Sequence, residues 1–214
     1  MKRTIAFIIS AFFMAVSSFP SFAQRQTYGR TSVEAYGSFG EIHANGYMGY
    51  FLPAGGGFNV SKYDYNWRWV LGADVLCSPH DYNEEAIYDK EGNLIAKSQY
   101  HILESTEICG AAGFLYRVWA TRSRSLCVSA GASLLLGIKA VPEMGKFYNP
   151  LTGDYCKTVG FFLAGMPEIQ VEYFPFTNIS FFGSLRPRMR MVEVLPGKSG
   201  WFRMNMAFGA KIYL

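Results

Sequence analysis

The stretch from Trp201 to Leu214 alternates between two kinds of side chain. One set carries no charge, and the other contains two cations and an amide. A period of two residues predicts a β-strand. An apolar face that runs unbroken to Leu214, with aromatic residues near both ends, favours the closing strand of an outer-membrane barrel. The apolar set is Phe202, Met204, Met206, Phe208, Ala210, Ile212 and Leu214.

Seven earlier stretches show the same alternation, which predicts eight strands in all. Bacterial outer-membrane barrels have an even number of strands. The second stretch is interrupted by Pro53 and by the glycines at 55–57, which indicate a bulge or a section of loop. The seven stretches are Thr31–Phe39, Tyr47–Val60, Trp67–Cys77, Tyr100–Trp119, Leu126–Val141, Lys157–Phe174 and Ile179–Val194.

The connections between the predicted strands differ in length. Those after the second, fourth and sixth strands are short, whereas Ser78–Ser98 and Pro142–Cys156 are long and rich in polar and turn-forming residues. Short periplasmic turns and long extracellular loops are typical of outer-membrane barrels. The sequence therefore predicts an all-β fold, an eight-stranded antiparallel transmembrane β-barrel with a filled lumen and both termini on the periplasmic side.

Charged residues on the strands fall mainly in the phase opposite the apolar set. A charge facing the bilayer midplane costs about 2–4 kcal/mol, so this phase should face the lumen, which side chains fill in an eight-stranded barrel. We expect a buried ion network, because unpaired charges in a closed lumen are costly. An anion-binding strip is the alternative. The residues expected in the network are Glu168, Glu172, Arg186, Arg188, Arg190 and Arg203.

A soluble lipocalin-like barrel is the main rival architecture. It would place apolar side chains inside and polar ones outside. The polar phase here also holds many Gly, Ala and Ser residues, which suit a tightly filled interior. We therefore favour the membrane barrel.

The first residues resemble an export signal. Lys2 and Arg3 precede an apolar run over 5–16, and small residues lead to Ala23. This pattern predicts a signal peptide at 1–23 that is cleaved after Ala23, leaving a single barrel domain at 24–214. A retained membrane anchor is the alternative, but the run is short for a span. We expect export to the outer membrane of a Gram-negative cell.

Composition agrees with an exported barrel. Half of the residues are hydrophobic, 17% are aromatic and only 17% are charged, and no uncharged apolar stretch of helical-span length follows Ala23. The formal net charge of +4, from 20 basic and 16 acidic residues, would fall to +2 on loss of Lys2 and Arg3. A net charge this small argues against direct nucleic-acid binding. We expect outer-membrane lipid to surround the barrel.

Candidate chemistry is sparse. His43, His80 and His101 have no metal-site or catalytic-triad spacing, so we expect no enzyme activity, no metal and no cofactor. A lipid-cleaving barrel would need a His on the outer surface in mid-strand. The acidic segment 81–91 lacks the spacing of a calcium loop and is expected to be a solvated loop.

Four cysteines in an exported chain allow disulfides. The predicted topology places Cys77 and Cys156 near the extracellular rim, where they could pair. Cys109 and Cys127 lie on neighbouring strands and could pair or remain as small buried apolar residues.

Several segments together resemble the conjugative-transposon TraO family. The most distinctive is the Arg-bearing seventh strand followed by a Gly-Ala-Lys-Ile ending. The resemblance implies an outer-membrane component of a conjugative DNA-transfer apparatus, without enzyme activity and with other envelope proteins as partners. A general small barrel for adhesion, surface binding or membrane integrity is the alternative function. The segments are 22–25, 32–35, 69–74, 113–116, 131–137, 183–188 and 208–212.

Overall fold

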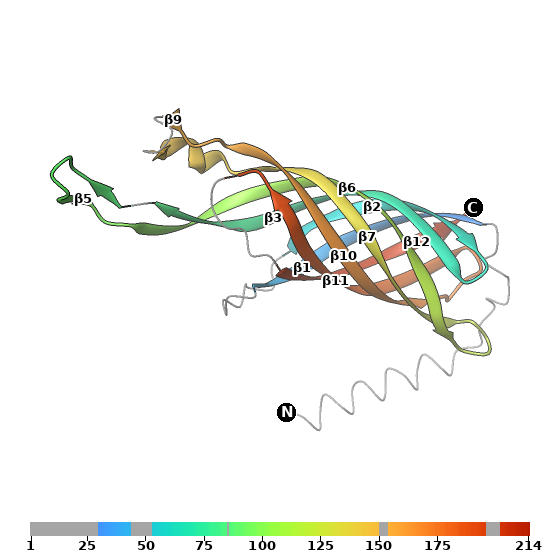
Figure 1. Ribbon diagram of the computed structural model, residues 1–214. Helices are drawn as coiled ribbons and strands as arrows, with labels where there is room; N and C mark the ends of the chain where they lie inside the picture. The colour runs from blue at the N-terminus through green and yellow to red at the C-terminus, as the bar shows by residue number, and fades with distance from the viewer. Residues whose placement is uncertain (1–29, 44–52, 85, 150–153, 196–201) are drawn as a thin grey trace, which may run out of the picture.

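A computed structural model describes residues 30–43, 53–84, 86–149, 154–195 and 202–214. Eight long antiparallel strands form a closed barrel (Figure 1), with ring order β1-β12-β11-β10-β7-β6-β3-β2. The predicted all-β, eight-stranded fold is therefore confirmed. These strands are β1 Thr31–His43, β2 Pro53–Asp64, β3 Trp67–Glu84, β6 Gln99–Ala120, β7 Leu126–Ala140, β10 Val159–Tyr173, β11 Ile179–Glu193 and β12 Phe202–Tyr213.

The barrel closes between its first and last strands. β1 pairs with β12 from Ser32 opposite Tyr213 to His43 opposite Arg203, with one register shift between Phe39 and Ile42. No edge of the main sheet is left open by this ring, because every barrel strand has a neighbour on each side.

The two ends of the barrel differ in their connections. At one end, near the C-terminus in Figure 1, strands are joined by Tyr65-Asn66 and by five-residue turns at 121–125 and 174–178. We call this the short-turn end. The opposite, long-loop end carries the connections with extra elements: β4 Ile87–Tyr88, β5 Leu94–Ala96, the 3-10 helix η1 Pro142–Lys146, β8 Tyr148–Asn149 and β9 Asp154–Tyr155.

Three strands continue well beyond their predicted ends. β1 runs past Phe39 to His43. β2 continues through 61–64, where the sequence predicts a turn. Tyr63 points inward there and is buried, which keeps this segment in the barrel wall. β3 continues past Cys77 to Glu84, and its pairing with β6 runs unbroken from Trp67 opposite Tyr116 to Glu84 opposite Gln99. The segment 78–84 is polar yet still alternates, so it forms a strand and not a loop. The expected first part of strand two, 47–52, lies outside the described residues, as does the expected signal peptide.

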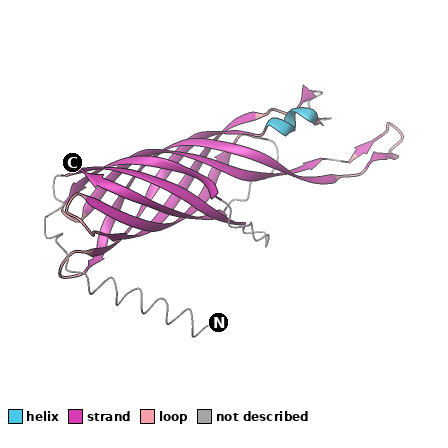
Figure 2. Cartoon of the chain, turned by 180° about the vertical axis from the view of Figure 1, so that it is seen from behind, coloured by secondary structure: helices cyan, strands magenta, loops and turns pink. Residues whose placement is uncertain are grey.

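β3 and β6 extend beyond the barrel as a two-stranded ribbon with the β4–β5 hairpin at its tip (Figure 2). The tip contains a turn at 91–93, where Gly92 has a φ of +85°. Asn93 donates from its side-chain amide and its backbone N–H to Asp89, over 2.8 and 2.6 Å, and these bonds lower the pKa of the Asp89 carboxyl.

Side-chain phase along the strands follows the prediction. Alternate residues of β10 and β11 are buried and exposed in turn. The outward residues are mostly large and apolar, such as Leu71 (67% exposed), Phe161 (65%) and Leu136 (64%), while the inward ones include most of the strand charges. A lipocalin-like arrangement, with its polar side outside, is therefore not the one observed.

Apolar clusters close the lumen near both ends. At the long-loop end, Met144 and Val141 are fully buried against Tyr82, Leu103 and the other members of their cluster. At the short-turn end a second cluster contains Tyr63, Cys127, Phe174 and Tyr213. The charged part of the lumen lies between these two clusters.

Candidate functional site

The lumen is the candidate site, because it gathers buried charge from seven of the eight barrel strands. Lys139, Lys211 and Glu34 are 0% exposed and Arg186 is 2% exposed. Buried charges persist only when they are paired and hydrogen-bonded. In the described chain, seven cations and six carboxylates form the buried pairs: Arg68, Lys139, Arg186, Arg188, Arg190, Arg203 and Lys211 with Glu34, Asp74, Glu107, Glu168, Glu172 and Glu193.

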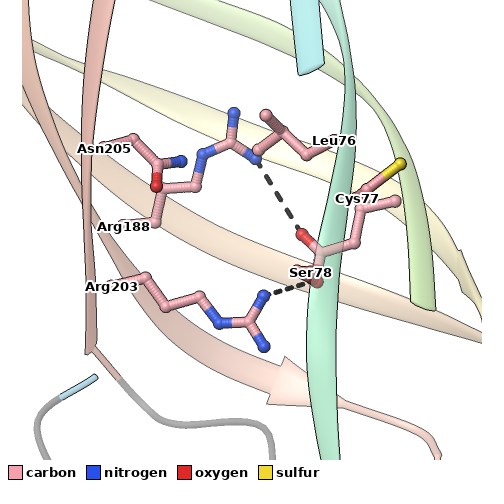
Figure 3. Close-up of a pocket in the computed structure, with 7 residues that line it drawn as sticks. Leu76, Cys77, Ser78, Arg188, Arg203 and Asn205 are labelled. Atoms are coloured by element: carbon pink, nitrogen blue, oxygen red, sulfur yellow. Dashed lines mark hydrogen bonds and ion pairs between the residues drawn. The ribbon is translucent and has the colours of Figure 1, made fainter. Parts of the chain in front are cut away.

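Glu107 on β6 is the centre of the half nearest the long-loop end. Its Oε1 atom lies 3.1 Å from Nη1 of Arg203 and 3.5 Å from Nζ of Lys139, and it also accepts from Arg190. Its Oε2 atom lies 3.9 Å from Nη1 of Arg188. Figure 3 shows the side chains of Arg188 and Arg203 extending from one wall of the barrel toward the strand that carries Leu76, Cys77 and Ser78.

The middle of the lumen contains two further pairs. Nη2 of Arg188 donates to Asp74 over 2.6 Å, and the hydroxyl of Tyr36 donates to the other oxygen of Asp74. Arg186 lies 3.0 Å from Glu168 and places its guanidinium 4.2 Å from the centre of the Tyr36 ring. Tyr36 therefore links these two pairs, by a hydrogen bond to one and by a cation–π contact to the other.

The half nearest the short-turn end is built around Glu172. Lys211 donates to Glu172 over 2.9 Å and to Gln170 over 2.7 Å, and Gln170 also accepts from Arg68 over 2.7 Å. The hydroxyl of Tyr213 donates to Glu172 as well. Glu172 is thus held by several donors in a space closed by the aromatic cluster at this end.

The structure brings some of the predicted network residues together, while others pair with residues outside the predicted set. Glu168 meets Arg186 as expected from neighbouring strands. Glu172 does not meet the arginines of β11 and pairs with Lys211 instead, while Arg188 and Arg190 converge on Glu107. The reason is that contacts across a closed lumen depend on the tilt and stagger of the strands, which strand order alone does not give.

Several partners lie outside the predicted set although they share its inward phase. The phase itself is the signal that could have found them, since a lumen that cannot hold unpaired charge must use every inward ion. Glu193, near the end of β11, joins the network through Lys139 and Arg190. The alternation assigns six further partners to the lumen, although they are not among the residues named for the network: Glu34, Arg68, Asp74, Glu107, Lys139 and Lys211.

The possible Cys77–Cys156 disulfide is not formed, and all four cysteines are free. Cys77 is exposed on the outer side of β3, whereas Cys156 is buried inside the long-loop cluster, 3.5 Å from the Tyr82 hydroxyl. The two side chains therefore lie on different sides of the wall. Cys109 and Cys127 are buried in separate clusters, so they fit the alternative of small apolar residues.

The histidines of the described chain occupy structural positions. His80 is fully buried, and His101 lies 3.3 Å from Glu84 with its ring 4.7 Å from that of Phe147. Within the described ranges no group of three or more His, Cys, Asp or Glu side chains is arranged to hold a metal ion. The His43 side chain lies outside what the structure describes.

A cavity beside Glu107 has a volume of about 10 Å³, lined by Leu76, Ser78, Arg203 and Asn205 among others (Figure 3). That is room for about one water molecule. The interior can hold charge in a fixed arrangement, but at this point it has no space for a solute. No helix in the described part of the chain is both long and apolar enough to cross a membrane.

No protein-family model matches this sequence, and no curated protein matches it at a significant level. Solved structures with a similar fold include the Neisserial surface protein A (11% identity, 86% of this chain and 95% of that chain, TM-score 0.47) and a major outer membrane protein from Thermus thermophilus (14%, 87% and 99%, 0.49). The attachment invasion locus protein Ail of Yersinia pestis is similar at 12% identity (87% and 98%, 0.43). Identities this low transfer no ligand or partner to this chain.

Proposed function

We propose that this chain is a non-enzymatic outer-membrane barrel that anchors a surface structure in the membrane. The observation that carries the proposal is the distribution of side chains, with ions inside and large apolar residues outside. In water this apolar surface would stay exposed, whereas lipid covers it. The hydrophobic effect therefore favours the bilayer as the surroundings of the barrel wall.

The long-loop end is the part that would act outside the membrane. A tilted strand needs about 9–11 residues to cross a bilayer, whereas β3 has 18 residues and β6 has 22. The excess length forms the ribbon, which is packed on its inner side against the η1 cluster. Its outer side and tip expose Tyr88 (61%), Ile95 (67%) and Ile102 (59%). These features support surface binding or adhesion through the ribbon.

Export by a signal peptide at 1–23, cleaved after Ala23, belongs to the same proposal. Short turns would then face the periplasm and the ribbon would face the outside. The proposal includes no cofactor and no direct contact with nucleic acid.

A role in a conjugative DNA-transfer apparatus rests on the TraO resemblance alone. In that case the ribbon or the periplasmic turns would contact other envelope proteins of the apparatus. Pull-down of crosslinked partners from donor cells would decide between this role and general surface binding. Recovery of transfer-apparatus components would favour the first.

The membrane proposal is tested by expressing the chain in a Gram-negative host. We expect an outer-membrane band that lacks 23 residues and migrates faster on a gel when it is not heated. Protease added to intact cells should cut within 85–98 and leave the barrel strands whole. A soluble periplasmic product without a heat-dependent shift would rule the proposal out.

A further inference from the structure

We propose that one sector of the short-turn end binds an anionic phospholipid. The sector consists of the adjacent strands β2, β3, β6 and β7 and holds outward-facing Lys62, the turn arginines Arg122 and Arg124, and a ridge of exposed aromatic rings. This inference rests on the proposed membrane location and adds to it the class of lipid that the wall recognises.

Lys62 is a cation on the lipid side of the barrel wall. It lies on the outward face of β2, as Val60 does two residues earlier. Its partners on the neighbouring strands are Thr31 on β1 and Trp69 on β3. A lysine there must extend its ammonium group toward the membrane surface. Tyr65 follows only three residues later at the turn, so an extended lysine side chain points toward this end of the barrel, where a membrane-spanning wall would meet the lipid headgroups.

The aromatic ridge lies next to Lys62 on β3 and β6. Trp69 is 58% exposed, and its ring centre is 6.1 Å from that of Phe114. Trp67 lies 4.9 Å from Tyr116 and 5.4 Å from Phe114. Exposed Trp and Tyr rings at one end of a membrane protein mark the headgroup region. An acyl chain can lie along this ridge while its headgroup lies above Trp67.

The turn between β6 and β7 adds two cations to the same sector. Its backbone is fixed by a bond from the Arg124 N–H to Thr121, and the hydroxyls of Thr121, Ser123 and Ser125 lie 2.8–3.4 Å from one another. The side chains of Arg122 and Arg124 are both exposed. The described structure shows no ion pair from either of them to a carboxylate.

The charge balance of the sector favours an anionic ligand. Among its described residues at this end, Asp64 is the one carboxylate, and the neighbouring turn between β10 and β11, at 174–178, has no charged residue. The opposite end of the barrel carries exposed Glu91, Glu104 and Glu143 among its lysines. Cations close to a membrane surface attract anionic lipids, with about a fivefold gain in binding for each Lys or Arg.

The test uses the full chain refolded in neutral detergent micelles. Equal amounts of phosphatidylglycerol and phosphatidylcholine are added, and the lipids retained on the purified barrel are measured by native mass spectrometry. We expect at least about a fivefold preference for phosphatidylglycerol that weakens as salt is raised. The variant K62Q/R122Q/R124Q should retain both lipids equally. The control K90Q/K97Q, which removes exposed lysines at the ribbon tip, should keep the preference.

Equal retention of the two lipids by the unaltered protein, or an undiminished preference in the triple variant, would overturn the inference. Folding is followed separately by the heat-dependent gel shift in phosphatidylcholine vesicles. A chain that fails to insert there contradicts the membrane proposal itself. A chain that inserts normally but shows no preference contradicts only the lipid site.

Discussion

Glu107 on β6 and Arg203 on β12 lie on opposite walls of the barrel, and their Oε1 and Nη1 atoms are 3.1 Å apart. Four strand positions separate β6 from β12 in either direction around the ring. Arg188 and Asp74 make a second contact between opposite walls, on β11 and β3, at 2.6 Å. Ion pairs therefore join walls that share no backbone hydrogen bond.

Removing the charge of Glu107 should strongly destabilise the barrel. Glu107→Gln leaves Arg203, Arg190 and Lys139 without their shared carboxylate in a closed lumen. Breaking a buried ion pair on one side typically costs about 3–5 kcal/mol. Equilibrium unfolding in urea, followed by Trp fluorescence in lipid vesicles, measures the loss. Glu104→Gln on the exposed side of the same strand is the control, and equal stability of the two variants would contradict the role of Glu107.

The Asp74–Arg188 contact should show coupling between its two partners. D74N leaves Arg188 with only the more distant carboxylate of Glu107, and R188M leaves Asp74 without its cationic partner, whereas the double variant removes both charges. The double variant should therefore be more stable than the sum of the single effects predicts, with a coupling of about 0.5–3 kcal/mol. Additive effects within experimental error would mean that the contact contributes nothing. The side-chain carbonyl introduced by D74N can still accept from Tyr36, so that hydrogen bond is kept in the cycle.

Gly131 should be essential for the pairing of β6 with β7. A Cβ atom built there would lie 2.0 Å from the backbone oxygen of Phe114, a group that cannot move without breaking the ladder. Gly131→Ala should therefore abolish the heat-dependent gel shift or greatly lower the yield of folded protein. Gly110→Ala, where the nearest atom to a Cβ is 3.9 Å away, is the matched control and should fold normally.

Cys77 should be the one reactive thiol of the folded protein. It is exposed on the outer side of β3, while Cys109, Cys127 and Cys156 are buried. A maleimide reagent should add a single label to the folded barrel and four after denaturation. C77S should remove the label from the folded form. Labelling of C77S at an undiminished level would show that a buried cysteine becomes accessible.

The lumen should not conduct ions in steps like those of a porin. Paired side chains fill it, and apolar clusters close it near both ends. Recordings of the reconstituted protein in a planar bilayer should remain at baseline, while a large porin inserted under the same conditions gives clear steps. Regular conductance steps from this protein would contradict a filled lumen.

The sequence predicts the strands well where they cross the barrel, because inward and outward sites have opposite chemistry. Glu34, Arg186 and Lys211 all lie in the phase that the alternation assigns to the lumen. Prediction is weaker beyond the barrel, where both faces of a strand can be polar. The sequence predicts a loop at 78–84 for that reason, although His80 and Tyr82 alternate inward and are buried in the ribbon.

The partners of each charge are harder to predict than its direction. Glu168 and Arg186 are on neighbouring strands, so their contact follows from strand order. Arg188 and Glu107 are brought together by side chains that cross the interior, and that geometry is set by strand tilt. The separation of Cys77 from Cys156 is also beyond the pattern, since Cys77 faces outward on β3 while Cys156 lies in the connection between β9 and β10, which folds inward onto the long-loop cluster.

The hydrogen-bonded seam between β1 and β12 has a consequence for how the protein can be made. A chain that lacks Phe202–Tyr213 leaves β1 and β11 each with an open edge of unpaired backbone N–H and C=O groups. Such an intermediate cannot be sealed by any other part of the sheet. The seam thus ties completion of the barrel to its two end segments: the sheet closes only when β1 and β12 meet, and every earlier stage exposes two open strand edges.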